Sequence, residues 1–490
     1  MAHENQLKTL EHAVRGSVLA RYGGQLAITV ALLNTIPLAA ALLGGFYSTA
    51  GALAVTIAIL GGGGWACRRA EAPADIQPNE ALVVAAGAFI LTPFVLVWPL
   101  SAYGLAPVDA WFEAVSAVTT TGLTTIESPQ QAPWPLLLTR SWMQWYGGLG
   151  FAVLCVALLA PRGLAARRLL EPTGAREFNI PSMTGHARQL FVAYSIFTVV
   201  AWLTLWAAEA DALRALLHTL SGVSTGGFSS LDASLSGFDR PASAWVLSLV
   251  TLLGAISLPL YVSAGRGDWR RVAGDPELRA LVVLALSVSL ALAAILATAG
   301  GMSPIAAVRH GLFVGISAQT GSGFTSLDPS TLPDAAKWTS ILAMTVGGSV
   351  GSTTGGIKLL RLLVLLRVIQ LLIRRMGLPP HAVSQPRLGG RGLEAAEVLQ
   401  ILAVPTLFLV VVTVSAVPFL IHGYPALDAL FEVVSATGTV GLSTGITSSD
   451  MPTMLKAVLA FDMLAGRMEF IAILVFLSPH TWIGRRYASS

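Results

Sequence analysis

The sequence is short of charged residues and holds only two cysteines. Lys, Arg, Asp and Glu make up 11% of its 490 residues, whereas a soluble globular protein carries about 25%. This shortage excludes a disordered chain and argues strongly against a soluble enzyme. Cys67 and Cys155 stand in apolar runs, so we expect buried thiols and neither a disulfide framework nor a zinc site. The first 25 residues are polar and lack the apolar stretch of a cleaved signal peptide.

What the sequence has in quantity is apolar length. Hydrophobic residues make up 54% of the chain and the mean hydropathy is +0.70, which indicates a polytopic, all-α membrane protein. Stretches of a length near the roughly 20 residues that a spanning helix needs occur at 26–43, 50–66, 81–100, 136–160, 190–208, 242–264, 281–299, 338–373, 398–421 and 454–477. Shorter apolar stretches, with the length of re-entrant segments, occur at 109–118, 212–223, 304–318 and 426–436.

The distribution of Lys and Arg predicts the orientation. With the N-terminus in the cytoplasm, 23 of the 30 basic residues, Lys358 among them, fall on the cytoplasmic side, as the positive-inside rule requires. This orientation places all four short stretches on the outer side. The net charge of +4 is too small to suggest nucleic acid as a partner.

A fourfold repeat is the most informative feature. Four segments align without gaps, and each has Ser, then Gly six positions later, then Leu or Phe, then Thr or Ser. These repeat segments are 116–124, 221–229, 317–325 and 435–443. Each unit reads as helix, re-entrant helix, loop and helix. The predicted division is 1–25 as a cytoplasmic segment, 26–70 as two extra helices, and 71–165, 166–268, 269–391 and 392–490 as the four repeats.

The repeat segments have the composition of an ion filter. A re-entrant helix ends with unpaired carbonyls and a partly negative dipole, and glycine lets the following carbonyls replace the hydration shell of a cation. The predicted potassium ligands are the backbone carbonyls of Thr120, Thr121, Gly122, Thr225, Gly226, Gly227, Gly321, Ser322, Gly323, Thr439, Val440 and Gly441. The last three match the Thr-Val-Gly core of potassium channels but do not continue to Tyr-Gly. We therefore expect a shorter filter that prefers potassium over sodium less sharply than a tetrameric channel does.

The span 338–373 is interrupted by a glycine-rich loop, residues 347–356, which predicts irregular backbone facing a cavity. A helix kink or close packing of small residues is the alternative. Arg467 lies inside the last span, where a charge is costly and usually functional. Its expected partners are the loop carbonyls, Asp462 or Glu469. The predicted gate consists of Gly347, Gly348, Ser349, Gly351, Ser352, Thr353, Thr354, Gly355, Gly356 and Arg467.

Other polar residues leave alternatives open. Glu113 and Glu432 precede their repeat serines by three positions, so they either bond loop amides behind the filter or draw cations to its mouth. His218 takes the same place in the second repeat, and we expect it to be structural rather than a metal ligand. Ser349 and Ser443 fit the G-x-S-x-G pattern of hydrolases, but the strand-to-helix turn and the His/acid pair are missing. No nucleotide-binding motif is complete, so any nucleotide must act through another chain.

At this point the residues resemble a known family. The four repeat segments, the stretch 347–358 and the stretch 464–469 are similar to the Trk/Ktr/HKT superfamily of potassium transporters. Two extra helices before the first repeat make the bacterial TrkH-type membrane subunits the most similar. The resemblance implies one pore from four repeats, a filter around Gly122, Gly227, Gly323 and Gly441, and a gating loop restrained by Arg467.

The same resemblance implies partners and a location. It implies a homodimer in the bacterial inner membrane, in contact with lipid, and a cytosolic TrkA-type ring that binds nucleotides and opens the gate. The basic stretch 361–391 is a candidate dock for that ring. Potassium would be the transported ion, and no cofactor is expected. The competing hypothesis is a symporter that couples potassium to protons or sodium, with Glu209, Asp462 or Glu469 as the coupling acid.

Overall fold

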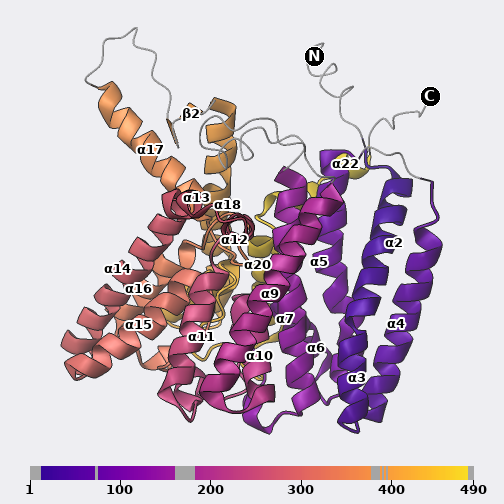
Figure 1. The fold of residues 1–490 in the computed structure, drawn as a ribbon, viewed down its shortest axis with the longest axis horizontal. Coiled ribbons are helices and arrows are strands. Elements are labelled where there is room, and N and C mark those ends of the chain that lie inside the picture. The colour runs from indigo at the N-terminus through magenta and orange to yellow at the C-terminus, as the bar shows by residue number, and fades with distance from the viewer. Residues whose placement is uncertain are drawn as a thin grey trace. The chain divides into compact units, whose positions relative to one another are not determined.

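The computed structural model describes residues 13–71, 76–159, 183–376, 387–388, 391–392 and 395–483. Helices dominate these residues, and a short antiparallel hairpin of β1 (Arg387–Leu388) and β2 (Arg391–Gly392) is added to them (Figure 1). Residues 1–12 of the cytoplasmic segment, the basic stretch 162–176 and the arginines at 485–486 lie outside the described residues, as do residues 377–386 and 389–390 of the basic stretch 361–391.

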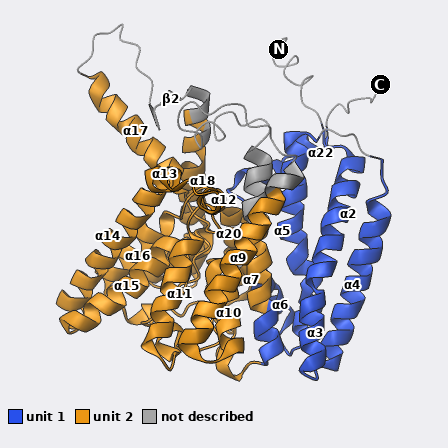
Figure 2. Cartoon of the chain, viewed as in Figure 1, with its two compact units in different colours: residues 1–115, 133–139, 468–490 blue, residues 116–132, 140–467 orange. Residues whose placement is uncertain are grey.

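The chain forms two compact units (Figure 2). Unit 1 holds residues 1–115, 133–139 and 468–490, and unit 2 holds residues 116–132 and 140–467. The helices of unit 1 are α2 (Gly16–Leu33), α3 (Thr35–Leu43), α4 (Tyr47–Cys67), α5 (Pro78–Ser101), most of α6 (Pro107–Val118), α21 (Ile471–Leu477) and α22 (Pro479–Trp482). The repeat segments and the glycine-rich loop all belong to unit 2.

Unit 1 is held by a close helix crossing and a buried ion pair. A Cβ atom on Gly24 of α2 would lie 2.7 Å from the Gly64 carbonyl oxygen of α4, which is the close approach that small residues permit between membrane helices. Arg15 Nε lies 2.7 Å from a carboxylate oxygen of the fully buried Glu80. Cys67 is exposed, so the expectation of a buried thiol is wrong at the end of α4, where the apolar run gives way to arginines.

Unit 2 repeats one packing pattern. The short helices α10 (Ala212–Val223), α15 (Pro304–Thr320) and α19 (Ala426–Thr437) each pack between the helix before and the helix after them. These flanking helices are α9 (Met183–Glu209), α11 (Pro241–Gly254), α14 (Pro276–Thr298), α16 (Asp334–Thr345), α18 (Ala395–Ile421) and α20 (Thr453–Arg467). Together with α6, the short helices cover the four short stretches that the sequence predicts, nearly to the residue.

Unit 2 also holds seven single or connecting elements. They are α7 (Trp134–Leu159), α12 (Leu258–Gly265), α13 (Trp269–Gly274) and α17 (Leu359–Arg375), and the 3-10 turns at Pro129–Gln131, Ser234–Gly237 and Pro329–Thr331 that follow the first three repeat segments.

Two predicted continuous spans are broken. The span 242–264 divides into α11 and α12, which meet at 95°. Pro259 explains the break, because a proline clashes with the carbonyl four residues earlier, here Ala255. The span 454–477 divides after Arg467, where Glu469 and Phe470 have φ values of 54° and 63° that no right-handed helix contains. The interruption of 338–373 is confirmed, because α16 ends at Thr345 and α17 begins at Leu359.

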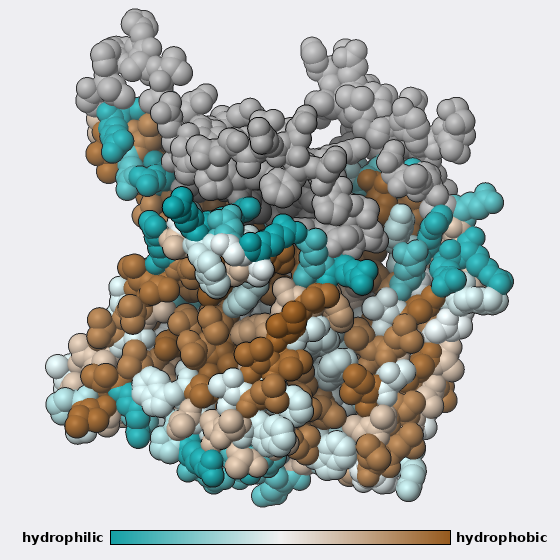
Figure 3. Space-filling view, viewed as in Figure 1, coloured by the Kyte–Doolittle hydropathy of each residue, from teal (hydrophilic) through white to brown (hydrophobic). Residues whose placement is uncertain are grey.

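The exposed surface is apolar over much of its length. Among the described residues, six helices are long and apolar enough to cross a membrane, and the bent pair α11–α12 makes a seventh. Apolar side chains cover the outward faces of α9 and α14, while hydrophilic ones gather over α13 (Figure 3). Leu290 on α14 is 63% exposed, which suits lipid rather than water. The chain is a multi-pass, all-helical membrane protein.

Candidate functional site

All four repeat segments turn in the same way at the end of their short helix. The backbone N–H five residues after each repeat serine donates to that serine's carbonyl, at 2.9, 2.7, 3.1 and 2.8 Å in chain order. The donors are Thr121, Gly226, Ser322 and Val440. The turn ends the short helix, and irregular backbone follows it.

Two residues of each segment have positive φ. The first is Thr120, Thr225, Gly321 or Thr439, with φ between 51° and 64°. The second is the repeat glycine, Gly122, Gly227, Gly323 or Gly441, with φ between 72° and 96°. A threonine in this region is a conformational outlier that costs about 1–3 kcal/mol. Three of the four segments accept that cost at the same position, so the conformation is imposed by the surrounding protein.

The four segments form a closed ring. A Cβ atom on Gly122 would overlap the carbonyl oxygen of Gly226 in the second segment. The same relation links Gly227 to Ser322, Gly323 to Val440 and Gly441 to Thr121. Each repeat glycine therefore faces the carbonyl that precedes the glycine of the next segment, and the fourth segment returns to the first. The twelve predicted ligands are brought together, and no side chain larger than hydrogen fits at the four glycines.

The ring is supported from behind by buried polar side chains. Ser116 and Ser435 accept hydrogen bonds from the amides of Gly122 and Gly441, at 3.0 and 3.1 Å. Glu432 is fully buried and accepts from Ser443 Oγ at 2.6 Å, from the Thr444 amide at 2.7 Å and from Thr447 Oγ1 at 2.8 Å. The sequence left two alternatives for Glu432, and the structure has the first of them, a hydrogen bond from a loop amide.

The equivalent positions in other repeats differ in chemistry. Glu113 is also fully buried. His218 is buried, with Nδ1 2.9 Å from the Arg214 carbonyl oxygen and Nε2 3.1 Å from Ser229 Oγ. It lies behind the second segment as a structural residue, and the described residues contain no group of three metal-ligating side chains.

Two supports were not predicted from the sequence. Gln144 of α7 donates from Nε2 to the Gly226 carbonyl at 2.5 Å and accepts from the Phe228 amide at 3.3 Å. Arg140, one turn earlier, is buried, donates to Thr124 Oγ1 at 2.8 Å and lies 3.8 Å from the Phe228 ring centroid. A charge and an amide within an apolar span were the available signal.

The glycine-rich loop lies against the ring. Thr353 Oγ1 is 3.2 Å from the Thr225 hydroxyl and donates to the Gly254 carbonyl at 3.1 Å. A Cβ atom on Gly355 would overlap Thr439 Oγ1. The loop therefore contacts the second and fourth repeat segments at their first positive-φ residues. The other predicted gate residues are also buried, and Val350, which lies in the same stretch but is not among them, is partly exposed.

The break between α11 and α12 binds the same loop. The Ala255 carbonyl, freed by Pro259, accepts from the Ser349 amide at 3.1 Å, and the Leu258 amide donates to Gly351 at 3.1 Å. A helix break in the second repeat thus supplies backbone partners to the loop of the third. Glu277 of α14 adds a carboxylate oxygen 2.7 Å from the Val350 amide.

Arg467 links the loop to the first repeat. Its side chain is fully buried, and its guanidinium donates to the Thr353 carbonyl and, at 3.1 Å, to the Gly147 carbonyl of α7. The predicted bond to a loop carbonyl is therefore present. Asp462, a second predicted partner, instead accepts from Ser415 Oγ at 2.7 Å.

The predicted count of basic residues on the cytoplasmic side includes Lys358, but its side chain is only 1% exposed. Its ammonium donates to the Thr354 carbonyl and lies 3.1 Å from Thr354 Oγ1. It binds the loop instead of setting orientation, because the loop folds back beside the start of α17.

Comparisons with known proteins agree with this geometry. Residues 49–482 match the family model described as TrkH, cation transport protein. The chain is 29% identical to the Trk system potassium uptake protein TrkH of Escherichia coli, over 76% of this chain and 79% of that protein. It is 28% identical to an uncharacterized cation transporter of Methanocaldococcus jannaschii, over 85% of each. The crystal structure of the potassium transporter TrkH from Vibrio parahaemolyticus superposes with a TM-score of 0.85 at 25% identity, covering 96% of this chain and 100% of that one.

Proposed function

The chain belongs to the TrkH family of cation transport proteins, and we propose that it conducts potassium down its electrochemical gradient through one gated pore formed by its four repeats. It is a transport protein and not an enzyme. The observation that carries the proposal is the closed ring, in which Gly122, Gly227, Gly323 and Gly441 each face a carbonyl of the next repeat.

The ring has the chemistry that a dehydrating cation needs. Backbone carbonyls replace water without introducing a charge that would hold the ion too strongly. The hydroxyls of Thr120 and Thr439 are buried, and neither has a hydrogen-bond partner among the described residues. These hydroxyls add oxygen atoms next to the ring. The short helices before the repeat segments also point their partly negative C-terminal ends toward the ring. Twelve residues in four equivalent triplets thus form the proposed filter.

The glycine-rich loop is the proposed gate. It contacts Thr225 and Thr439 directly, so it lies beside the same path as the ring. Arg467 holds the Thr353 carbonyl and a carbonyl of α7 at once. Opening requires these bonds to break together with those from Ala255 and Leu258. The gate therefore acts as a unit, and Gly347–Gly356 supplies the backbone freedom for its movement.

The assembly extends this proposal. We infer a homodimer in a bacterial inner membrane, in contact with lipid, with the N-terminus in the cytoplasm and the repeats divided as in the sequence. A cytosolic TrkA-type ring that binds nucleotides would control the gate, as the resemblance to the Trk/Ktr/HKT superfamily implies. The relative from Escherichia coli is named as part of a Trk system, which supports a multi-component assembly.

Coupled symport is the second candidate, and one residue favours it. Asp462 is fully buried, and one of its two oxygens has no hydrogen-bond partner among the described residues. Buried carboxyl groups inside membrane spans form the proton relays of many transporters. Glu209 is a weaker candidate, because Arg214 already binds it at 2.8 Å.

The experiment is ion flux in vesicles that contain the purified full chain. A channel predicts potassium flux that is unaffected by an imposed proton or sodium gradient, together with some sodium permeation. Removing residues 349–354 from the loop should raise that flux. Flux that requires the proton gradient would support symport, and no change on shortening the loop would remove the gate.

A further inference from the structure

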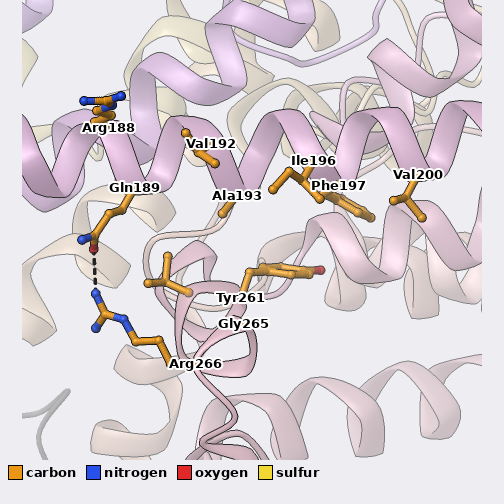
Figure 4. Close-up of a pocket in the computed structure, with 11 residues that line it drawn as sticks. Arg188, Gln189, Val192, Ala193, Ile196, Phe197, Val200, Tyr261, Gly265 and Arg266 are labelled. Carbon is orange, nitrogen blue, oxygen red and sulfur yellow. Dashed lines mark hydrogen bonds between the residues drawn. The ribbon is translucent and has the colours of Figure 1, made fainter.

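A cavity of about 610 Å³ opens between α9 and α12, and none of its lining residues belongs to the ring. Both helices belong to unit 2 and pack against each other. Figure 4 shows Gln189, Ala193 and Phe197 along α9, across the cavity from Tyr261 and Arg266. The α9 residues recur every three or four positions, so one face of that helix forms a wall of the cavity.

The two ends of the cavity differ in chemistry. Arg188, Gln189 and Arg266 line one end, and Arg266 Nη2 donates to Gln189 Oε1 at 3.1 Å. The rest is apolar, with Val200 56% exposed and Phe197 stacked on Tyr261 at 5.4 Å. Two arginines that line one end of an apolar groove match a phosphodiester followed by an acyl chain.

The place of the groove favours lipid over a protein partner. α12 turns 95° away from the spanning α11, so it runs across the direction of the spans, as an interfacial helix does. The carboxylate of Asp268 accepts a bond from the Arg271 amide at 3.2 Å, whereas the bond of Arg266 goes to the uncharged Gln189. A basic cluster at the edge of an apolar span attracts anionic lipid headgroups.

We propose that this groove binds one anionic phospholipid, with its phosphate between Arg188 and Arg266 and one acyl chain along Ala193, Phe197 and Val200. Tyr261 forms the floor, and its hydroxyl is fixed by a 2.7 Å bond to the Leu253 carbonyl at the end of α11. The bound lipid contacts the helix whose first residue, Leu258, donates to Gly351 of the glycine-rich loop. The proposal does not depend on which ion is transported.

The test is native mass spectrometry of the purified full chain, titrated with phosphatidylglycerol and with phosphatidylcholine of the same acyl chains. The wild type should bind the first more tightly. R188Q/R266Q should weaken phosphatidylglycerol binding by about fivefold for each arginine removed, and R188K/R266K should restore most of it. R270Q is the matched control, because Arg270 is exposed on α13 and does not line the cavity; it should change binding by less than about twofold.

Two further measurements distinguish a bound lipid from free phosphate. Ala193→Phe keeps both arginines but fills the groove, so it should abolish lipid binding, whereas a site for free phosphate would be unaffected. Glycerophosphoglycerol, the headgroup without chains, should not compete at the same concentration. Three results would overturn the proposal. The wild type would bind the two lipids equally, R270Q would weaken binding as much as the double variant does, or R188Q/R266Q would lose the mass of the dimer instead of the mass of the lipid.

Discussion

The ring of repeat segments and the glycine-rich loop both place irregular backbone inside an apolar protein, but different bonds hold them. In the ring, each segment makes the same backbone hydrogen bond within itself, from a donor such as Thr121 to a serine carbonyl. The loop has internal bonds too, such as the one from the Gly348 amide to Thr354 Oγ1 at 2.9 Å, but it is also tied to other elements through Ala255, Leu258, Glu277 and the buried Arg467.

The difference predicts different behaviour. A turn closed by its own backbone and repeated four times has no alternative partner, so it suits a fixed coordination site. The glycine-rich loop depends on single side chains and on a helix break. Its conformation therefore changes when those few contacts break or form, which suits a switch. Substitutions in the ring should therefore change which ion passes, and substitutions around the loop should change how much passes.

The largest expected effect is on selectivity, at Gly441. In Gly441→Ser the new Cβ overlaps the Thr121 carbonyl, so the potassium-to-sodium permeability ratio should fall about tenfold or more, as measured by bi-ionic currents. Gly445→Ser is the matched control, because Gly445 has nearly the same φ, 89° against 92°, but open space around it. If both variants lose selectivity equally, backbone strain and not the ring contact is responsible.

Arg467→Ala should have the next largest effect, on flux. It removes charge-assisted bonds worth about 1.5–3 kcal/mol each, so potassium flux in vesicles should rise about tenfold while selectivity stays the same. Arg140→Ala removes an equally buried arginine that binds the ring instead, and it should lower selectivity without raising flux. An unchanged flux in Arg467→Ala would separate this residue from the gate.

A smaller rise in flux, about two- to fivefold, is expected for Lys358→Met. The variant keeps the apolar stem but loses the bonds to Thr354. We expect a smaller effect because the bonds to Thr354 run to a residue only four positions away, so they stabilise the loop locally. Arg367→Met, at an exposed position of α17, should leave the flux unaltered, and a similar rise there would point to general loss of charge on the helix.

The smallest effect is expected for Glu432→Gln. The amide keeps the shape of the carboxylate but weakens three bonds behind the fourth segment. The melting temperature in detergent should fall by a few degrees and selectivity by less than tenfold. The control, Glu127→Gln, changes an exposed acid that accepts one bond from Ser449 at 2.7 Å, and its melting temperature should equal that of the wild type. Equal melting temperatures for the two variants would show that the buried network does not stabilise the fold.

The same comparison shows what could be read from the sequence. The ring was predictable, because four copies of Ser and Gly at fixed spacing repeat one local conformation, and the short helices have apolar stretches of matching length. Arg467 could be found since a charge within a span is rare. The partners of the loop could not be found, because Ala255 and Leu258 contribute through their backbones at a break that Pro259 causes. Lys358 was misplaced since charge counting assumes that a lysine beside a span is exposed.

The most direct test of the account is the reversal potential of the purified protein in a planar bilayer, with potassium on one side and sodium on the other. We expect a reversal potential that favours potassium but shows measurable sodium permeation, and a shift toward zero in Gly441→Ser but not in Gly445→Ser. A wild-type reversal potential at zero, or one that Gly441→Ser leaves in place, would contradict a potassium filter formed by the ring.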